Sequence, residues 1–441
     1  MNVIHRLSVF QIIVASFGAA VLLGAFLLML PVSSAAGTWT PFLDALFTSV
    51  SATCVTGLVV YDTGTYWSLF GEIVIIVLIQ IGGMGVVTVA MILVVLSGQR
   101  VSLMQRSTLQ EAVAAPQLGG IVQMLRFIGK WVFLIELLGA LCMAPVFIET
   151  FGMARGLWFA VFHSISSFCN AGFDLMGIIE PGSSLIHFAS SPSINLSVMA
   201  LIVVGGLGFI TWADVSVNGF HFHRYRLQTK MILVTTALLI FIPAVVFFLC
   251  DFAGVEGPAR FWVSLFQSVT ARTAGYNTVD FGTMTEAGRM LLVVLMVIGG
   301  APGSTAGGVK VTTLFTVISS AIATFRQQRD VNVFGRRIGA ESMRLALAVV
   351  MMYLALLIIG SLVISYSGGF SMLDALFEAA SAIGTVGLSI GVTADADTLT
   401  RSILMFLMFF GRVGGLTLIY ALQKTTSRSS ARYPEEKVSV G

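Results

Sequence analysis

Charged residues are scarce in this chain, and their scarcity decides its class. Asp, Glu, Lys and Arg make up only 10% of the 441 residues, whereas 57% are hydrophobic. A soluble globular protein carries about 25% charged residues, so this chain has too few of them to cover a water-facing surface. The composition excludes an ordinary soluble protein and predicts a protein that is embedded in a membrane.

Cysteine is also scarce, and the motifs of common enzymes are missing. The four cysteines show no C-x-x-C spacing of the kind used for metal or redox sites, and we expect buried free thiols. No ATP-binding P-loop, zinc-ligand spacing or nucleophile elbow occurs in the sequence. We therefore expect no enzyme activity, no covalently bound cofactor and no resident metal. The four thiols are Cys54, Cys142, Cys169 and Cys250.

Long apolar runs take the place of the missing charge. A helix needs roughly 20 apolar residues to cross the hydrocarbon core of a membrane. Seven runs qualify, and an eighth, Met290–Phe325, is interrupted by glycine and proline. These runs predict an all-α membrane protein with eight spanning helices. The seven runs are Phe10–Leu30, Ile73–Leu96, Trp131–Ile148, Ile194–Ala213, Met231–Cys250, Leu345–Ser367 and Ser402–Leu422.

The first run has a second interpretation as a secretory signal peptide. Ser33-Ser34-Ala35-Ala36, directly after it, resembles a cleavage site. The run is longer than the usual apolar region of 7–15 residues, and the repeat described below requires a helix here. We therefore expect a spanning helix.

Basic residues are distributed unequally between the two ends of the expected helices. By position, 17 of the 24 Lys and Arg residues fall in segments that share one side. The other side holds more acids, including Asp62, Asp280 and Asp395. Because basic segments stay in the cytoplasm, we expect a multi-pass protein of the cell membrane with both termini cytoplasmic. The net charge of +3 then reflects topology and contact with lipid, and it predicts no nucleic-acid partner.

A short apolar segment that ends in glycine recurs between the helices of each pair. The first copy, residues 43–58, and the fourth, residues 373–388, are identical at nine of sixteen positions. The four copies end at Gly57, Gly172, Gly275 and Gly387, a period of roughly 110 residues that indicates an internal repeat. The sequence divides into repeats at residues 1–100, 101–222, 223–335 and 336–424, followed by a cytoplasmic tail at 425–441.

A second glycine pattern follows each short segment, within the next expected helix. The matching sets are Gly82-Gly83-Met84-Gly85, Gly205-Gly206-Leu207-Gly208, Gly299-Gly300 and Gly414-Gly415. Each repeat is therefore predicted to consist of a helix, a short helix, a glycine-containing turn and a second helix.

The short segments have one physically sensible place. Non-helical backbone at membrane depth is tolerated only when it is buried in protein or lines a water-filled path. Four such loops around one axis can present rings of carbonyl oxygens that replace the water around a potassium ion. Glycine permits the positive φ that this requires, and each short helix would direct its negative C-terminal end at the cation. A single copy would more often be a packing helix, but four copies predict a pore.

The motifs in these loops and helices resemble those of the Trk/Ktr/HKT superfamily of cation transporters, and most closely the KtrB-type potassium-transporting membrane subunits. The resemblance covers nearly the whole chain. It is carried by Val55-Thr56-Gly57-Leu58, Asn170-Ala171-Gly172-Phe173, Arg272-Thr273-Ala274-Gly275-Tyr276-Asn277, Thr385-Val386-Gly387-Leu388, Gln80-Ile81-Gly82-Gly83, Gly303-Ser304-Thr305-Ala306-Gly307-Gly308 with Lys310, Gly411-Arg412-Val413-Gly414 and Arg432-Tyr433-Pro434.

The resemblance implies a pseudo-fourfold, potassium-channel-like fold around one central pore. In plant relatives a serine in the first loop goes with sodium preference, so Gly57 indicates potassium. The implied selectivity filter comprises Val55, Thr56, Gly57, Asn170, Ala171, Gly172, Thr273, Ala274, Gly275, Thr385, Val386 and Gly387. The implied gate comprises Gly299, Gly300, Gly303, Ser304, Thr305, Gly307, Gly308 and Lys310, together with Arg412 in the last helix.

The resemblance also implies partners. A homodimer would dock on a cytosolic ring of nucleotide-binding regulator subunits (KtrA-type), so that nucleotide would act only through the partner. Potassium would be the transported ion, with the role of sodium as activator or coupled ion left open.

Three other functions remain open at this point. A sodium-permeable transporter of the same superfamily would share these motifs. A secondary transporter with alternating access usually has inverted repeats, whereas these four repeats have one orientation. A sensor or structural subunit would have a closed pore.

Three ionisable residues lie inside the apolar runs, where charge is costly. Arg412 is expected to act electrostatically below the filter or in a structural ion pair, and Lys310 either to join the gate or to extend to the cytoplasm. For Glu136, in an outer helix, we expect a structural hydrogen bond. Ala301-Pro302 departs from the resemblance, which implies only small residues in the gating loop. A passive kink is the alternative interpretation of that loop.

Overall fold

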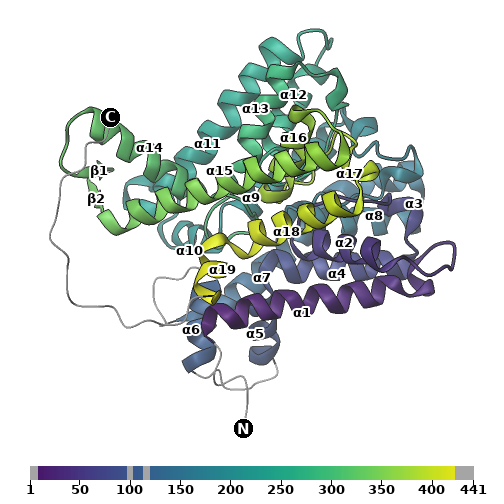
Figure 1. Ribbon diagram of the computed structural model, residues 1–441, viewed down its shortest axis with the longest axis horizontal. Coiled ribbons are helices and arrows are strands. Elements are labelled where there is room, and N and C mark those ends of the chain that lie inside the picture. Colours follow the sequence, from purple (N-terminus) through teal and green to yellow (C-terminus); the bar gives the residue numbers. More distant parts are fainter. Residues whose placement is uncertain (1–7, 97–102, 113–119, 423–441) are drawn as a thin grey trace.

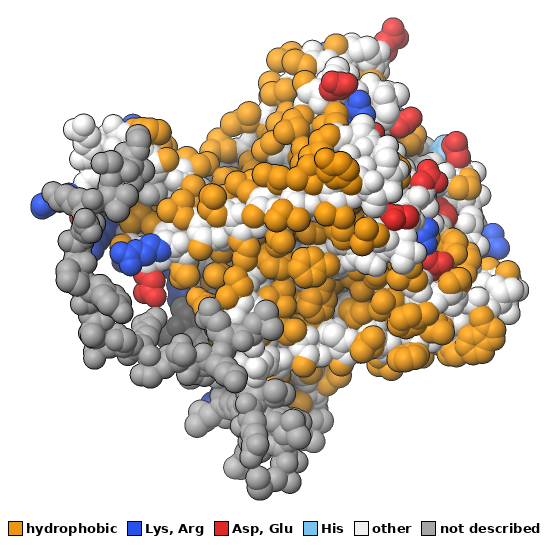
Figure 2. Space-filling view, in the orientation of Figure 1, with side chains coloured by type: hydrophobic (Ala, Val, Ile, Leu, Met, Phe, Trp, Pro, Cys, Tyr) orange, Lys and Arg blue, Asp and Glu red, His pale blue; other side chains and the backbone are white. Residues whose placement is uncertain are grey.

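The computed structural model describes residues 8–96, 103–112 and 120–422, and these residues are predominantly helical (Figure 1). Helices α1 (Val9–Met29), α15 (Ala340–Gly368) and α18 (Thr398–Val413) lie with their axes roughly parallel across the molecule, with the chain of α18 running opposite to that of the other two (Figure 1). Figure 2 shows that hydrophobic side chains cover most of the face along these helices, whereas charged side chains gather at their two ends. This distribution is typical of helices that lie in lipid with their ends in water.

Four long helices are each apolar enough to cross a membrane. The α1 helix begins after Ser8, whose hydroxyl caps it in a reciprocal capping box with Gln11. The α7 and α15 helices begin before the apolar runs expected at Trp131–Ile148 and Leu345–Ser367. Their first turns contain polar residues, which a search for apolar runs leaves out. The four are α1 (Val9–Met29), α7 (Ile121–Phe151), α11 (Leu227–Val246, continued by a π-helical turn at Phe247–Asp251) and α15 (Ala340–Gly368).

Four short helices follow the long ones, and each packs against the long helix before it. They contain 12 to 16 residues, and at a rise of about 1.5 Å per residue they cannot cross a hydrocarbon core of about 30 Å. These are the four short segments that the sequence predicts. They are α2 (Phe42–Thr53), α8 (Met153–Phe168), α12 (Ala259–Thr270) and α16 (Met372–Gly384).

Three of the helices that follow are sharply bent, which corrects the prediction of continuous spans. The runs Ile73–Leu96, Ile194–Ala213 and Ser402–Leu422 each form two helices, at angles of 91°, 95° and 93°. Both halves of each run are apolar, so hydropathy alone does not reveal the bend. The pairs are α4 (Leu69–Met84) with α5 (Val86–Leu96), α9 (Pro192–Gly206) with α10 (Phe209–Asn218), and α18 (Thr398–Val413) with α19 (Gly415–Leu422).

One glycine in a positive-φ conformation produces each bend. Gly85, Gly208 and Gly414 have φ of 86°, 85° and 89° with ψ of 128°, 144° and 131°. This region of the backbone map is nearly closed to other residues. The near-identical φ and ψ angles show that the same glycine conformation ends all three helices.

A second glycine, three residues before each bend, lets the helix pack against the short helix of its own repeat. A Cβ atom on Gly82, Gly205 or Gly411 would lie 2.0, 2.0 or 2.1 Å from a carbonyl oxygen of Thr53, Phe168 or Ile383. The counterpart of Gly82 in the last helix is therefore Gly411. The expected pairing of Gly414-Gly415 with Gly82-Gly83 is out of register and wrong.

The eighth apolar run is interrupted, as the sequence predicts. It forms α13 (Glu286–Val297) and α14 (Val311–Phe325), separated by an irregular stretch at residues 298–310 that we call the glycine-rich stretch. Its two ends are held together by backbone hydrogen bonds. Gly299 N donates to Val309 O at 2.9 Å, and Val311 N donates to Gly300 O at 3.0 Å.

The remaining elements are small. Helices α3 (Thr63–Tyr66), α6 (Leu103–Ala112) and α17 (Val392–Asp395) lie in connections. A two-stranded hairpin of β1 (Val331–Val333) and antiparallel β2 (Arg336–Ile338) follows α14. The expectation of a purely α-helical chain is corrected by this hairpin, whose Val331 and Ile338 pack with Met231.

Contacts between the units close into a cycle. The helix after each short helix packs on the short helix of the following unit, in the pairs α4 with α8, α9 with α12, and α13 with α16. The last helix, α18, packs on α2 of the first unit. Residues separated by most of the chain length are thereby brought around one centre. Within the described residues, four helices can cross a membrane, or up to seven if each bent pair counts as one span.

Candidate functional site

The four repeat-ending glycines lie next to one another in a closed ring. Cβ atoms added to Gly57, Gly172, Gly275 and Gly387 would lie 2.4, 2.8, 2.3 and 2.1 Å from the carbonyl oxygens of Ala171, Ala274, Val386 and Thr56. Each glycine thus faces the carbonyl that precedes the next glycine along the chain, and the fourth faces that of the first. We call this arrangement the glycine ring. It has no room for a side chain at any of its four glycines.

A left-handed residue stands two positions before each glycine of the ring. Val55, Asn170, Thr273 and Thr385 have φ of 58°, 59°, 70° and 52°. Only seven non-glycine residues in the described part of the chain have positive φ, and four of them are these. Such residues cost about 1–3 kcal/mol each and persist only where the surroundings enforce them. The four loops therefore share one unusual backbone conformation.

A hydroxyl at the end of each short helix anchors the loop that follows. Ser51 Oγ accepts a hydrogen bond from Gly57 N at 3.1 Å, and Ser381 Oγ accepts one from Gly387 N at 3.0 Å. In the other two repeats the hydroxyl donates to a carbonyl just beyond the glycine. The bonds are Ser166 Oγ to Phe173 O at 2.8 Å and Thr270 Oγ1 to Tyr276 O at 2.6 Å.

These four hydroxyls were not among the expected site residues. Their sequence signal is a hydroxyl six residues before the glycine in repeats one, two and four, and five residues before it in the shorter third repeat. Aligning the repeats on their glycines reveals this column, but only the structure shows that it holds the ring.

One side of the ring opens into a cavity of about 250 Å³. All four glycines line it, together with the acids Asp62 and Asp174. Asp62 also ties two connections together, because Gly64 N and Gly182 N donate to its carboxylate at 3.0 and 3.3 Å. Asp174 is partly buried in the connection after α8, and this burial raises its pKa to about 7. The carboxylates make the cavity favourable for cations.

The glycine-rich stretch contacts the loops at residues that precede the ring glycines, and none of its residues lines this cavity. Ala301 N donates to Gly206 O at 2.9 Å, so the stretch docks on the bend between α9 and α10. The Thr305 hydroxyl contacts the Asn170 side chain at 3.1 Å. A Cβ atom on Gly307 would lie 2.1 Å from Thr385 Oγ1. The stretch therefore packs directly against two of the four loops.

Two basic side chains hold the glycine-rich stretch through carbonyl oxygens. The Arg412 guanidinium donates to Gly82 O and Gly83 O at 2.5 and 2.8 Å, and also to Thr305 O. Lys310 Nζ donates to Ala306 O at 2.7 Å and to Gly307 O at 3.3 Å. Arg412 occupies the position of Gly83 and Gly206 in the other bent helices, so its side chain is a feature of the fourth repeat.

The structure brings the expected filter residues and the expected gate residues into contact with each other. The twelve expected filter residues form the four loops around the ring. The expected gate residues other than Arg412, which lies in α18, belong to the glycine-rich stretch, in which Ser304 Oγ donates to Ala301 O at 2.6 Å. Glu136 makes the structural hydrogen bond expected of it, accepting from Gln80 Nε2 at 2.9 Å.

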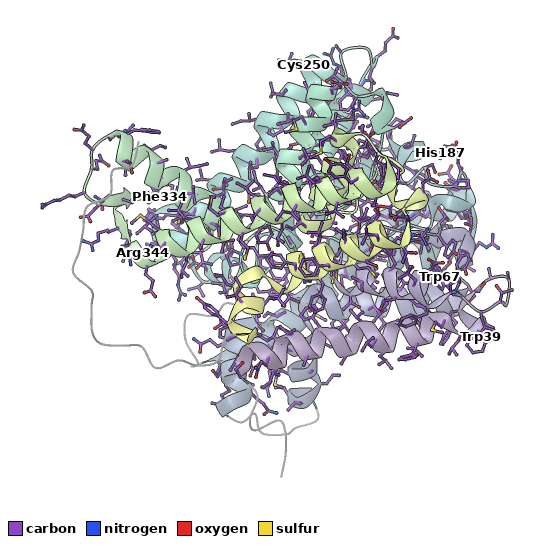
Figure 3. The ribbon with its side chains drawn as sticks, viewed as in Figure 1. Trp39, Trp67, His187, Cys250, Phe334 and Arg344 are labelled. Atoms are coloured by element: carbon purple, nitrogen blue, oxygen red, sulfur yellow. The ribbon has the colours of Figure 1, made fainter. Side chains whose placement is uncertain are left out.

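The expectation of four buried thiols is half right. Cys54 and Cys169 are buried at the ends of α2 and α8. Cys142 and Cys250 are exposed, and Cys250 lies at the top edge of the molecule in Figure 3. An exposed thiol on an apolar helix is compatible with contact to lipid. An apolar run in the sequence does not reveal whether a side chain faces lipid or is buried in protein.

Comparison with known proteins agrees with this geometry. Residues 6–433 match the TrkH family model, described as cation transport protein. The chain is 37% identical to the potassium/sodium uptake protein NtpJ of Enterococcus hirae, over 99% of this chain and 98% of that one. It is also 37% identical to the Ktr system potassium uptake protein B of Bacillus subtilis, over 98% and 96% of the two chains.

A solved structure shares the fold. The crystal structure of the potassium transporter TrkH from Vibrio parahaemolyticus superposes with a TM-score of 0.74, covering 94% of this chain and 85% of that one at 20% identity. The family match extends over nearly the whole chain and includes all four loops of the ring. The chain is therefore a membrane protein that belongs to the TrkH family of cation transport proteins.

Proposed function

We propose that this chain takes up potassium ions across the cytoplasmic membrane through a gated central pore. The observation that carries the proposal is the glycine ring, in which four loops from distant parts of the chain meet around one centre. Carbonyl oxygens from such loops can replace the hydration shell of potassium. The names of the relatives, potassium/sodium uptake protein and Ktr system potassium uptake protein B, support the choice of ion.

In this proposal the pore has four repeats and eight spans. Each of the four long helices is one span, and each of the three bent pairs is one span. The eighth span consists of α13 and α14, which the glycine-rich stretch separates. The cyclic packing of the units supports this count. The repeats correspond to residues 1–100, 101–222, 223–335 and 336–424.

The four loops then act as the selectivity filter. The carbonyls of Thr56, Ala171, Ala274 and Val386 are the proposed ligands, because each lies against the ring glycine of the preceding repeat. The four short helices end directly before the loops, so their negative C-terminal ends favour a cation there. The acidic cavity on the other side of the glycines would serve as the outer entrance.

The glycine-rich stretch is the proposed gate. It packs against Asn170 and Thr385 of the filter loops, on the side opposite to the cavity. Arg412 connects it to the bend of α4, and hydrogen bonds from a charged group contribute about 1.5–3 kcal/mol each. A stretch held by few strong hydrogen bonds can exchange between a blocking and an open position when other hydrogen bonds replace them.

The orientation follows from the ends of the molecule. Figure 3 places Phe334 and Arg344 at one end of the long helices and Trp39, Trp67 and His187 at the other. The end with the hairpin carries the larger share of basic residues and would face the cytoplasm. The chain's two ends, outside the described residues, would then lie on the cytoplasmic side.

The proposed partners are a second copy of the chain and a cytosolic ring of nucleotide-binding regulator subunits. The word system in the name of the Bacillus subtilis relative supports further components. A second candidate ion is sodium, because one relative is named for potassium and sodium together.

Uptake into liposomes tests the proposal. The purified chain should take up rubidium with saturation, and external potassium should compete better than sodium. Equal competition by both ions would favour a non-selective cation transporter. Absence of saturable uptake by well-folded protein would favour a sensor or structural subunit.

A further inference from the structure

A buried polar residue occupies the same position in each of the four short helices. It directly follows a buried phenylalanine in every repeat. Each of the four polar side chains has at most 1% of its surface exposed. Polar groups buried in this way need hydrogen-bond partners. The residues are Thr48 after Phe47, His163 after Phe162, Gln267 after Phe266 and Glu378 after Phe377.

In two repeats this side chain reaches the chain segment that leaves the glycine ring. Leu175 N donates to His163 Nε2 at 3.4 Å. Gln267 Nε2 donates to Thr278 Oγ1 at 3.2 Å. Leu175 and Thr278 each lie three residues beyond the ring glycine of their repeat. The side chain thus braces the outgoing segment against the short helix.

Glu378 makes the most extensive brace of the four. Its Oε1 accepts hydrogen bonds from the Ser389 hydroxyl and, at 3.3 Å, from Ile390 N. Its Oε2 accepts one from Thr393 Oγ1 at 2.9 Å. One fully buried carboxyl group therefore binds three points on the segment that begins two residues after Gly387.

The first repeat lacks this brace at the equivalent position. The Thr48 hydroxyl donates to Asp44 O at 3.0 Å, inside its own helix. Asp44, one helical turn earlier, takes the role instead and accepts from the Tyr61 hydroxyl at 2.8 Å. Asp44 also pairs with Arg401 at 2.6 Å. Thr48 is thus a natural counterpart to Glu378 that does not touch an outgoing segment.

We propose that Glu378 is a positioning residue for ion selectivity. Its carboxyl group fixes residues 389–393, and through the short connection from Gly387 it fixes the fourth side of the glycine ring. Glu378 does not line the cavity that contains the ring glycines, whereas Ser389 does. It therefore acts on the ion through the loop and not by contact. This inference rests on the proposed function of the ring as a potassium filter.

The test compares ion preference among variants of the full chain in liposomes. The readout is the sodium concentration that halves rubidium uptake, divided by the potassium concentration that does so. In Glu378→Ala this ratio should fall by about fivefold, the effect of losing about one net hydrogen bond. Glu378→Gln should restore most of the preference, because an amide can accept from Ser389 and Ile390 and donate to the Thr393 oxygen. The matched control Thr48→Ala should keep the wild-type ratio.

Partner variants keep the test decisive if Glu378→Ala does not fold. Ser389→Ala combined with Thr393→Val removes two donors from the same carboxyl group and should lower the ratio in the same direction. The inference is overturned if the folded variants keep the wild-type ratio, or if Thr48→Ala changes it equally. A wild-type chain with no preference for potassium would instead overturn the proposed function itself.

Discussion

At the scale of single residues, the ring depends on backbone conformations that side chains rarely accept. Each loop combines a left-handed residue with a positive-φ glycine two positions later. The loops can keep this strained geometry because hydroxyls such as Ser51 and Ser381 hold their amides. Selectivity should therefore be sensitive to any substitution that changes the backbone at these positions.

Serine at Gly57 or Gly275 should weaken the preference for potassium. The φ values of 93° and 84° are unfavourable for serine, and its Cβ would lie 2.4 or 2.3 Å from a carbonyl oxygen of the next loop. We expect sodium to compete about tenfold better for rubidium uptake, equal to about 1.4 kcal/mol. Competition assays in liposomes measure the change.

Gly257→Ser is the matched control for backbone strain. Gly257 also has a positive φ, 71°, but a Cβ atom there would meet no atom within 4 Å. It lies outside the ring, and its substitution should leave ion preference unchanged. If Gly257→Ser and Gly57→Ser alter preference equally, the glycine loops are ordinary packing segments.

The carboxyl group of Asp174 should make uptake depend on external pH. Burial raises its pKa to about 7, and the nearby charge of Asp62 contributes in the same direction. Asp174 is then mostly neutral at pH 6 and negatively charged at pH 8, when it attracts cations into the cavity. Uptake at low potassium should rise about threefold from pH 6 to pH 8, as measured by rubidium flux.

Asp174→Asn should remove this pH dependence. Asp395→Asn, an exposed acid that does not line the cavity around the ring, should retain it. A pH profile that is unchanged in Asp174→Asn would mean that another group controls entry.

The glycines of the ring could be predicted from sequence, whereas their supports could not. Gly57, Gly172, Gly275 and Gly387 stand out because a periodic glycine in an apolar segment has few other uses. The partners of Arg412 are invisible in the sequence, since backbone carbonyls carry no residue identity. Its contacts with Gly82 and Gly83 join residues from opposite ends of the chain.

At the scale of elements, the sequence predicts which helices exist better than how they bend. Apolarity continues through Gly85, Gly208 and Gly414, so a hydropathy argument gives one straight span where the structure has two helices. The glycine-rich stretch is predictable because several glycines and a proline together make a poor helix. A lone glycine in a helix is ambiguous, since it can mark either a bend or close packing.

Deletion of residues 302–307 should raise basal cation flux about tenfold, equal to about 1.4 kcal/mol, because the deleted residues pack against the filter loops. The chain before the deletion already lies beside the chain after it, as a Cβ atom on Gly299 would lie 3.2 Å from Gly308 Cα. The flux should also depend less on a cytosolic regulator. Rubidium uptake into liposomes, with and without a regulator, measures both effects.

Ser304→Ala is the control for this element. It removes one hydrogen bond inside the stretch and should leave basal flux nearly unchanged. If the deleted protein has a wild-type unfolding temperature but conducts no faster, the stretch is a hinge and the gate lies elsewhere.

At the scale of the whole molecule, closure depends on contacts between the first and last units. The packing of α18 on α2 and the hydrogen bonds of Arg412 join residues more than 300 positions apart. Sequence periodicity predicts four similar units but not their order around a centre. Here the order follows the chain, because each unit packs on the short helix of the next.

This arrangement predicts which residues face the outside of the cell. In a chain with Cys142→Ala and Cys250→Ala, single cysteines at Glu256 or Asp395 should react with an impermeant thiol reagent added to intact cells. Cysteines at His221 or Gln328 should react only after the membrane is opened. All four positions are exposed, so access to the reagent depends on their side of the membrane. The remaining thiols, Cys54 and Cys169, are buried and should stay silent.

The labelling pattern separates the possible topologies because each one leaves a different set of sites outside the cell. With eight spans and cytoplasmic termini, Glu256 and Asp395 lie on the same side because two spans, α13 with α14 and then α15, separate them in sequence. If α13 and α14 did not form one span, these two sites would lie on opposite sides and only one would react. If the whole chain were inverted, His221 and Gln328 would react in intact cells and the positive-inside assignment would be wrong.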